Sequence, residues 1–265
     1  MNIWFPIKPP AIFGVSYALA AFPVLSDAAA DNDIAGFRRT LAEATSRILF
    51  FIIPIAALFL ILRAQIVRAV LGSSIVFDWA DTVLTSRTLF WLAVGLVAEA
   101  MLPLLLRGFY AKRKTLVPLI IVIIGNVFTI ICGLWLTKYY DIPGLALASA
   151  LGSYLQLVLM WLLLRLATDG LEENRIVASL IRIIAATAVM VFVAQGIKTG
   201  LGVFLGTTTL FSVALQGGAS AIIAFLTYIS VLRLMHSEEL AEIVDIMRDR
   251  LFAFAVDKEG LREDV

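Results

Sequence analysis

The stretch that decides the fold is Leu116–Leu136, LVPLIIVIIGNVFTIICGLWL, which contains no charged residue. A bilayer core of about 30 Å is crossed by about 20 predominantly apolar residues in a helix. Hydrocarbon offers no hydrogen bonds to the backbone, so an isolated spanning segment has to be helical. The stretch therefore predicts a membrane-spanning helix with an amide, Asn126, near its middle.

Six further apolar runs flank this one, and the short run Ile48–Leu62 can be lengthened as helix by Leu41–Ser46. Charged residues make up 15% of the chain, whereas a soluble domain has about 25%. The pattern predicts an all-α polytopic membrane protein with seven transmembrane helices within residues 1–236. Residues 237–265 are predicted to form a cytoplasmic amphipathic helix, Ser237–Phe254, and a frayed tail. The six runs are Ala11–Ala29, Ile48–Leu62, Leu89–Leu106, Gly144–Leu164, Ile176–Ile197 and Thr209–Leu232.

Lysines and arginines are divided unequally between the two sets of loops. Six lie in the N-terminal segment and in the loops on the same side of the predicted membrane, and fifteen lie in the other loops and the C-terminal tail. Cytoplasmic loops carry the excess of basic residues. We therefore expect the N-terminus outside and the C-terminus inside. An N-out start with only Lys8 ahead of the first span also suggests that a preceding helix is missing.

The composition excludes several classes of function. The chain has one cysteine, Cys132, and one histidine, His236, so a metal site built on these residues is not expected. It contains no nucleophile elbow and no phosphate-binding loop, which argues against an enzyme. The net charge of +1 gives no sign of nucleic-acid binding. No cofactor is expected.

Glu99 is the most unusual residue of the predicted spans, because it lies near the middle of Leu89–Leu106. A carboxylate at that depth costs about 2.5–3.5 kcal/mol on insertion scales. We therefore expect Glu99 to face the bundle interior or a wet cavity. Two interpretations stay open: a group that lines a cavity or carries a proton, and a protonated or paired interhelical hydrogen bond.

Other polar residues have a functional and a structural interpretation. Arg107, with Lys112, Arg113 and Lys114, could bind a lipid phosphate. We favour the structural interpretation, in which this basic turn only sets the orientation of the chain in the membrane. Asp27 is more readily an interfacial charge than a substrate contact. Asn126 and Gln156 favour hydrogen bonding between helices.

Small residues mark two further places. The row Gly144, Ala148 and Gly152 allows another helix to approach closely. Gly217-Gly218, with Ala221, predicts a part of the last helix with little side-chain volume. Close packing against another helix is the favoured interpretation, and a groove that holds an acyl chain is the alternative.

Several motifs resemble the MurJ (MviN) family. The first is Gly14–Ala30, GVSYALAAFPVLSDAAA, followed by Phe37–Leu41, FRRTL. Further motifs are Gln65–Gly72, QIVRAVLG, and Pro103–Ala111, PLLLRGFYA. Their order and spacing agree with the family over nearly the whole chain.

The resemblance implies a flippase of lipid II, the lipid-linked peptidoglycan precursor, in the bacterial cytoplasmic membrane. The family has fourteen helices in two lobes, and this chain resembles the eighth to fourteenth. The family's functional arginines lie mostly in the other lobe, and one belongs before the first span, where only Lys8 stands nearby. The resemblance also implies that the sixth and seventh spans form a groove for the polyprenyl tail.

The partners implied are membrane lipid, the lipid-linked precursor and a separate N-terminal half polypeptide. Two alternatives stay open. One is a structural subunit that does not transport. The other is a cation-coupled drug or polysaccharide exporter of the same superfamily, with Glu99 as the coupling carboxylate.

Overall fold

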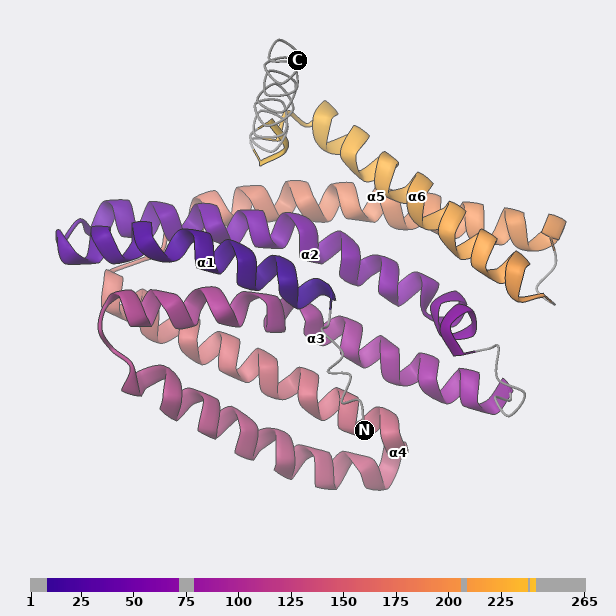
Figure 1. Ribbon diagram of the computed structural model, residues 1–265, viewed down its shortest axis with the longest axis horizontal. Coiled ribbons are helices and arrows are strands. Elements are labelled where there is room, and N and C mark those ends of the chain that lie inside the picture. Colours follow the sequence, from indigo (N-terminus) through magenta and orange to yellow (C-terminus); the bar gives the residue numbers. More distant parts are fainter. Residues whose placement is uncertain (1–8, 72–78, 206–208, 238, 242–265) are drawn as a thin grey trace, which may run out of the picture.

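The computed structural model describes residues 9–71, 79–205, 209–237 and 239–241, and the regular structure within these residues is helical. Figure 1 shows the helices stacked roughly side by side, as expected for a polytopic bundle. They are α1 (Pro9–Ala30), α2 (Ile34–Leu71), α3 (Trp79–Ala111), α4 (Leu116–Thr168), α5 (Glu173–Leu205) and α6 (Leu210–Leu234).

The seven predicted spans are confirmed as helix. Two of them, residues 116–136 and 144–164, fall within α4, which breaks at Asp141, where φ is 52° and ψ is −137°. Five helices, α2 to α6, are long and apolar enough to cross a membrane by length and composition. The predicted helix at 237–254 lies almost entirely outside the described residues.

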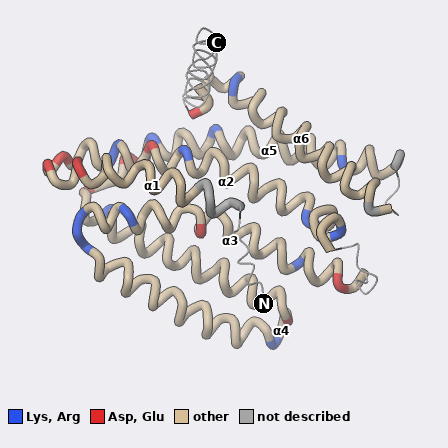
Figure 2. The backbone as a smooth tube through the Cα atoms, viewed as in Figure 1, with Lys and Arg blue, Asp and Glu red and all other residues tan. Residues whose placement is uncertain are grey.

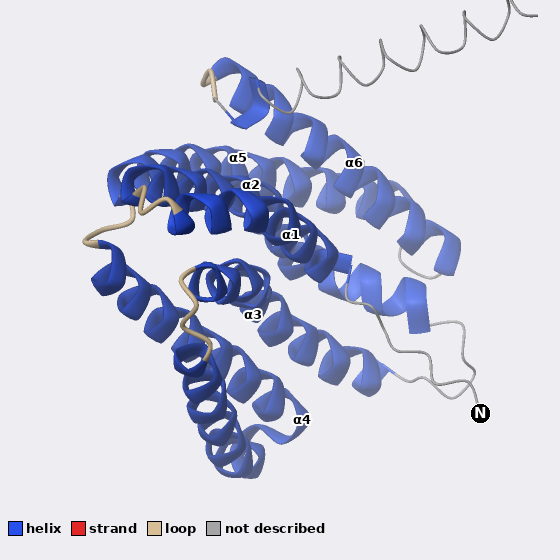
Figure 3. Cartoon of the chain, turned by 60° about the vertical axis from the view of Figure 1, so that its left-hand side comes forward, coloured by secondary structure: helices blue, strands red, loops and turns tan. Residues whose placement is uncertain are grey.

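Helix α2 is the centre of the arrangement, since it packs against α1, α3, α5 and α6. The pair α5 and α6 lies on one side of it, and α3 lies on the other, where it packs in turn against α4. Figure 3 shows the two halves of α4 as a hairpin at the edge of the bundle. The other helices are therefore arranged around α2, with α4 outermost on the side of α3.

The turns between helices alternate between two ends of the bundle. The turns α1–α2, α3–α4 and α4–α5 share one end, and the break in α4 lies at the other (Figure 1). Figure 2 shows a block of basic residues at the α3–α4 turn on the first end, which we call the basic end. The loops predicted to share a side thus do so, whereas the identity of that side as cytoplasmic stays a prediction.

Glycines bring the two halves of α4 into contact. A Cβ atom at Gly152 would collide with Oγ1 of Thr129, and one at Gly125 would collide with the Gln156 side chain. Gly133 faces Ala148, whose Cβ would be 3.8 Å from an added Cβ. The close approach predicted from Ala148 and Gly152 is confirmed, because this hairpin leaves no room for larger side chains.

Side chains at the basic end fasten the helices to one another. Arg38 donates a hydrogen bond from Nε to the carbonyl of Thr168, and Lys112 donates from Nζ to the carbonyl of Ala167. Both acceptors lie at the C-terminus of α4, where carbonyls lack partners within the helix. Glu43 of α2 pairs with Arg39 at 3.0 Å and with Arg175 of α5 at 3.1 Å.

Candidate lipid groove and polar sites

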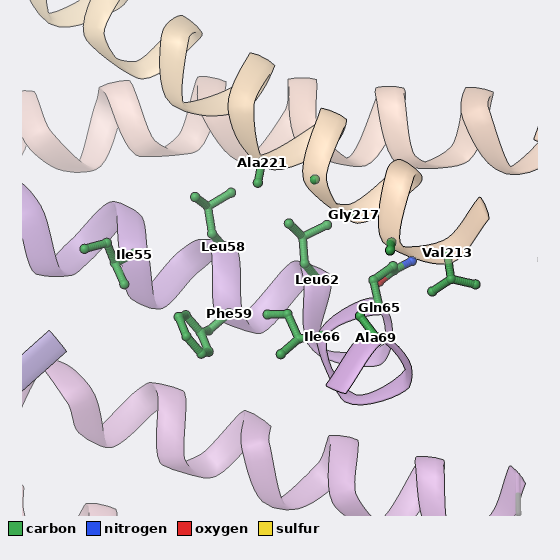
Figure 4. A pocket seen from close by; sticks show the side chains of 12 residues that line it. Ile55, Leu58, Phe59, Leu62, Gln65, Ile66, Ala69, Val213, Gly217 and Ala221 are labelled. Atoms are coloured by element: carbon green, nitrogen blue, oxygen red, sulfur yellow. The ribbon is translucent and has the colours of Figure 1, made fainter. Parts of the chain in front are cut away.

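An apolar groove of about 380 Å³ lies between α2 and α6. Figure 4 shows Leu58, Leu62 and Gln65 of α2 pointing toward α6. Gln65 is the one polar side chain among the described residues that line it. The lining residues are Ile55, Leu58, Phe59, Leu62, Gln65, Ile66, Ala69, Val213, Ala214, Gly217, Gly218 and Ala221.

The two adjacent glycines of α6 have different surroundings. A Cβ at Gly217 would lie 3.1 Å from Cβ of Gln65, so Gly217 allows α6 to press against α2. A Cβ at Gly218 would meet no atom within 4 Å, so Gly218 leaves space open. Gly217 therefore serves close packing, and Gly218 lies at an open groove. That this groove holds an acyl chain stays a prediction.

The groove has a different second wall from the one that the resemblance implied. Its lining comes from α2 and α6, and none of the described lining residues belongs to α5. Helix α5 is instead held against α6 on another face, where Gln216 donates a hydrogen bond to the carbonyl of Lys198. Lys198 in turn donates to the carbonyl of Ile61 at 3.2 Å, which joins α5 to α2.

Gln65 gives the groove a single polar feature. Its Oε1 atom is buried and has no hydrogen-bond partner among the described residues. A buried acceptor without a partner is costly, and such groups in a cleft are candidates for contact with a ligand. In the sequence, Gln65 is distinguished only as part of the motif QIVRAVLG, because a single amide in a helix carries no signal of its own.

Glu99 lies on α3 between the buried residues Ala98 and Ala100, and it is itself partly buried. Helix α1 crosses close by, because a Cβ at Gly14 would collide with the carbonyl of Ala100. The expectation that Glu99 turns away from lipid is compatible with this position. Its role in transport stays a prediction.

Three of the other candidate residues take part in interhelical hydrogen bonds. Gln156 is buried and donates from Nε2 to Oδ1 of Asn126 at 3.4 Å. The bond joins the two halves of α4, which confirms the interpretation of this pair as an interhelical contact. Arg107 of α3 donates from Nη1 to the carbonyl of Val15 on α1 at 3.2 Å.

The structure brings Asp27 together with the basic turn, which the sequence did not indicate. Asp27, Asn32 and Tyr110 line a hollow of about 720 Å³ at the basic end, together with the three cations Lys112, Arg113 and Lys114. Burial lowers the pKa of Lys112, and the nearby charges of Lys114 and Arg38 lower it further. Lys8 lies outside the described residues.

Comparison with known proteins identifies the family. The profile of the family described as "Lipid II flippase MurJ" matches residues 7–233. The chain belongs to the MurJ family. A probable lipid II flippase MurJ of Buchnera aphidicola is 26% identical over 179 residues, which are 68% of this chain and 35% of that protein. One from Vibrio cholerae is 28% identical over 153 residues, which are 58% of this chain and 29% of that protein.

A solved structure supports the same fold. Lipid II flippase MurJ in an inward closed conformation superimposes with a TM-score of 0.66, at 23% identity, over 88% of this chain and 46% of that chain. The chain thus has the fold of part of a MurJ protein, and it spans about a third of the length of the curated relatives that it matches. The groove and the polar sites above are features of this MurJ-like portion.

Proposed function

We propose that this chain forms part of a flippase that moves a lipid-linked peptidoglycan precursor, lipid II, across the bacterial cytoplasmic membrane. The observation that carries the proposal is the family match along residues 7–233, joined to a membrane-spanning fold. Two-lobed transporters of this kind work by alternating access around a site near the midplane. The remainder of the cavity would come from sequence that the longer relatives carry, on the same polypeptide or on a second one.

In this proposal the α2–α6 groove holds the polyprenyl tail. Its lining is almost entirely apolar, so burying a hydrocarbon chain there leaves few polar groups unsatisfied. Gly218 keeps the groove open, and Gly217 sets the separation of its two walls. The Oε1 atom of Gln65 lies where it can accept a hydrogen bond from the more polar end of a bound lipid.

The polar head would be handled by the rest of the transporter, with Glu99 and Arg107 on the side that this chain contributes. Arg107 is held by α1, so a shift of α1 against α3 would change where its guanidinium points. The basic end is proposed to face the cytoplasm, where the three cations of the hollow lined by Asp27 would attract lipid phosphates.

Photo-crosslinking tests the tail groove. The purified chain in nanodiscs would be exposed to a polyprenyl phosphate that carries a photoreactive group in its tail. Gly218→Leu fills open space without a collision and should reduce labelling of α6 at least fivefold. Gly196→Leu is the matched control, because a Cβ at Gly196 of α5 also meets nothing within 4 Å, and Gly196 does not line the groove. Equal labelling of the two variants would contradict a tail in this groove.

A further inference from the structure

A second pocket, of about 460 Å³, lies at the end of the bundle opposite the basic end. Three elements contribute to it: the end of α2, the beginning of α3 and the break in α4. Its chemistry differs from that of the groove, because it combines two arginines, one carboxylate and four aromatic rings. The lining residues are Arg63, Leu84, Arg87, Phe90, Trp91, Tyr139, Tyr140, Asp141 and Pro143.

The pocket contains two guanidinium groups, those of Arg63 and Arg87. Within the described part of the chain, no carboxylate forms an ion pair with Arg63 or Arg87, although Asp141 lines the same pocket. The Arg63 guanidinium lies 5.2 Å from the centre of the Phe90 ring. Two like charges that share a hollow repel each other, and an anion between them removes that repulsion. Guanidinium groups also bind phosphate and carboxylate in a bidentate manner.

The aromatic rings indicate what the anion is attached to. Phe90 and Trp91 are perpendicular, with ring centres 5.0 Å apart, so they present two differently oriented surfaces at one place. The C–H groups on the face of a pyranose ring pack well on such surfaces. Aromatic residues at the membrane interface anchor a helix individually, with each ring facing the lipid head groups. Such anchoring does not explain the convergence of these rings with two arginines in one pocket.

Asp141 adds a hydrogen-bond acceptor that is held in an uncommon backbone conformation. Its φ of 52° is unusual for a residue other than glycine, and it marks the break between the two halves of α4. A carboxylate at this point can accept hydrogen bonds from sugar hydroxyls. The pocket thus offers cations for an anionic group, aromatic faces for a ring and an acceptor for hydroxyls, within a volume suitable for a small ligand.

We propose that this pocket binds an anionic pyranose, a sugar ring that carries a phosphate or carboxylate group, as the head of a glycolipid passes the end of the bundle opposite the basic end. The inference rests on the proposed function for the direction of that movement. It adds a site for the head, separated from the tail groove, on the side where transport would deliver the lipid.

The test measures binding of soluble head analogues to the full chain in nanodiscs that hold no glycolipid. Calorimetric titration would compare N-acetylglucosamine 1-phosphate with N-acetylglucosamine and with inorganic phosphate. The phosphosugar should bind at least tenfold more tightly than either of the other two. Inorganic phosphate binding as tightly as the phosphosugar would overturn the proposal, because it would reveal an anion site without a contact to the ring. Absence of phosphosugar binding would overturn it as well.

Variants separate the two kinds of contact. Arg63→Gln with Arg87→Gln should weaken phosphosugar binding at least tenfold. Arg68→Gln with Lys138→Gln removes the same charge from the same end, outside the pocket, and should change binding less than twofold. Trp91→Leu should weaken binding of the phosphosugar and leave that of inorganic phosphate unchanged. Equal losses in the two double variants would overturn the proposal. A chain that binds no phosphosugar but supports transport would overturn this inference and leave the proposed function intact.

Discussion

The Tyr228 hydroxyl of α6 donates a hydrogen bond of 2.7 Å to the carbonyl of Phe50 on α2. The acceptor is the carbonyl that Pro54 cannot bond, because proline has no N–H to donate to the residue four positions before it. Tyr228 and Phe50 are both fully buried. A proline in a membrane helix is tolerated where a neighbouring helix satisfies the freed carbonyl, and here α6 does so.

The first prediction concerns this bond. Tyr228→Phe should destabilise the bundle by about 1–2 kcal/mol, because it leaves a buried carbonyl without a partner. In a Pro54→Ala background, the restored N–H of residue 54 bonds to Phe50, so the same substitution should cost less than half as much. Thermal unfolding in detergent measures both. Tyr110→Phe, at an exposed tyrosine, is the control and should be neutral. An equal cost in both backgrounds would show that Tyr228 acts through packing alone.

The second prediction is a pH dependence at Glu43. Burial raises the pKa of this carboxyl, but the hydrogen bond and charge of Arg39 and the charge of Arg175 together lower it below its ordinary value. A lowered folded-state pKa gives stability that is present above the unfolded-state pKa of about 4.3 and is lost as the pH falls through the folded-state pKa. Glu43→Gln should therefore destabilise at pH 7 by no more than about 1 kcal/mol, because the pair is partly exposed.

Unfolding midpoints of Glu43→Gln and of the wild type should converge as the pH falls through the folded-state pKa of Glu43, because the carboxyl group then becomes protonated in both states. About 0.5 M salt at pH 7 should also narrow the difference. Asp31→Asn removes an exposed charge from the turn between α1 and α2 and serves as the control. A difference that persists unchanged at low pH would mean that the ion pairs do not link α2 to α5.

The third prediction concerns Glu99. Glu99→Gln keeps the size and the hydrogen-bonding capacity of the side chain, so the thermal stability of the bundle should change by less than about 1 kcal/mol. In a complete transporter assembled with the N-terminal lobe of a MurJ relative, the variant should move lipid II at least fivefold more slowly. A lipid II flipping assay in proteoliposomes measures the rate across pH 5–8. Wild-type transport by the Gln variant over that range would leave Glu99 only a structural role.

The fourth prediction is the orientation. The basic end should face the cytoplasm, because the loops on that side carry most of the arginines and lysines. A fluorescent protein fused after residue 265 should fluoresce, and alkaline phosphatase at the same place should be inactive. Phosphatase activity from that fusion would reverse the assignment of both ends. The pocket that contains Arg63 and Arg87 would then face the cytoplasm.

Much of the fold could be predicted from the sequence. Each apolar run is a helix, because a long hydrophobic segment in hydrocarbon has to form its backbone hydrogen bonds within itself. The close helix contact at Gly152 and the bond between Asn126 and Gln156 could also be predicted. These residues lie on the two halves of α4, which are joined by a short turn and therefore pack side by side. Spacing along each half indicates which residues share the facing surface.

The rest depends on contacts between helices distant in the sequence. Nothing in the order of residues indicates that Tyr228 reaches Phe50, or that α2 rather than α5 forms the second wall of the groove. The pocket that contains Arg63 and Arg87 could not be predicted for the same reason. Arg63, Arg87 and Tyr140 lie within three different helices, and they line one pocket only because these helices converge in space.

The most direct test of the central claim is rescue of bacterial cells depleted of their lipid II flippase. We predict that this chain, co-expressed with a polypeptide that supplies the N-terminal lobe of a MurJ relative, restores growth and lipid II translocation. Glu99→Gln in the same pair should restore them poorly, and the chain expressed alone at the same level should not restore them. Rescue by the isolated chain, or failure of the assembled pair when both parts reach the membrane, would contradict the account.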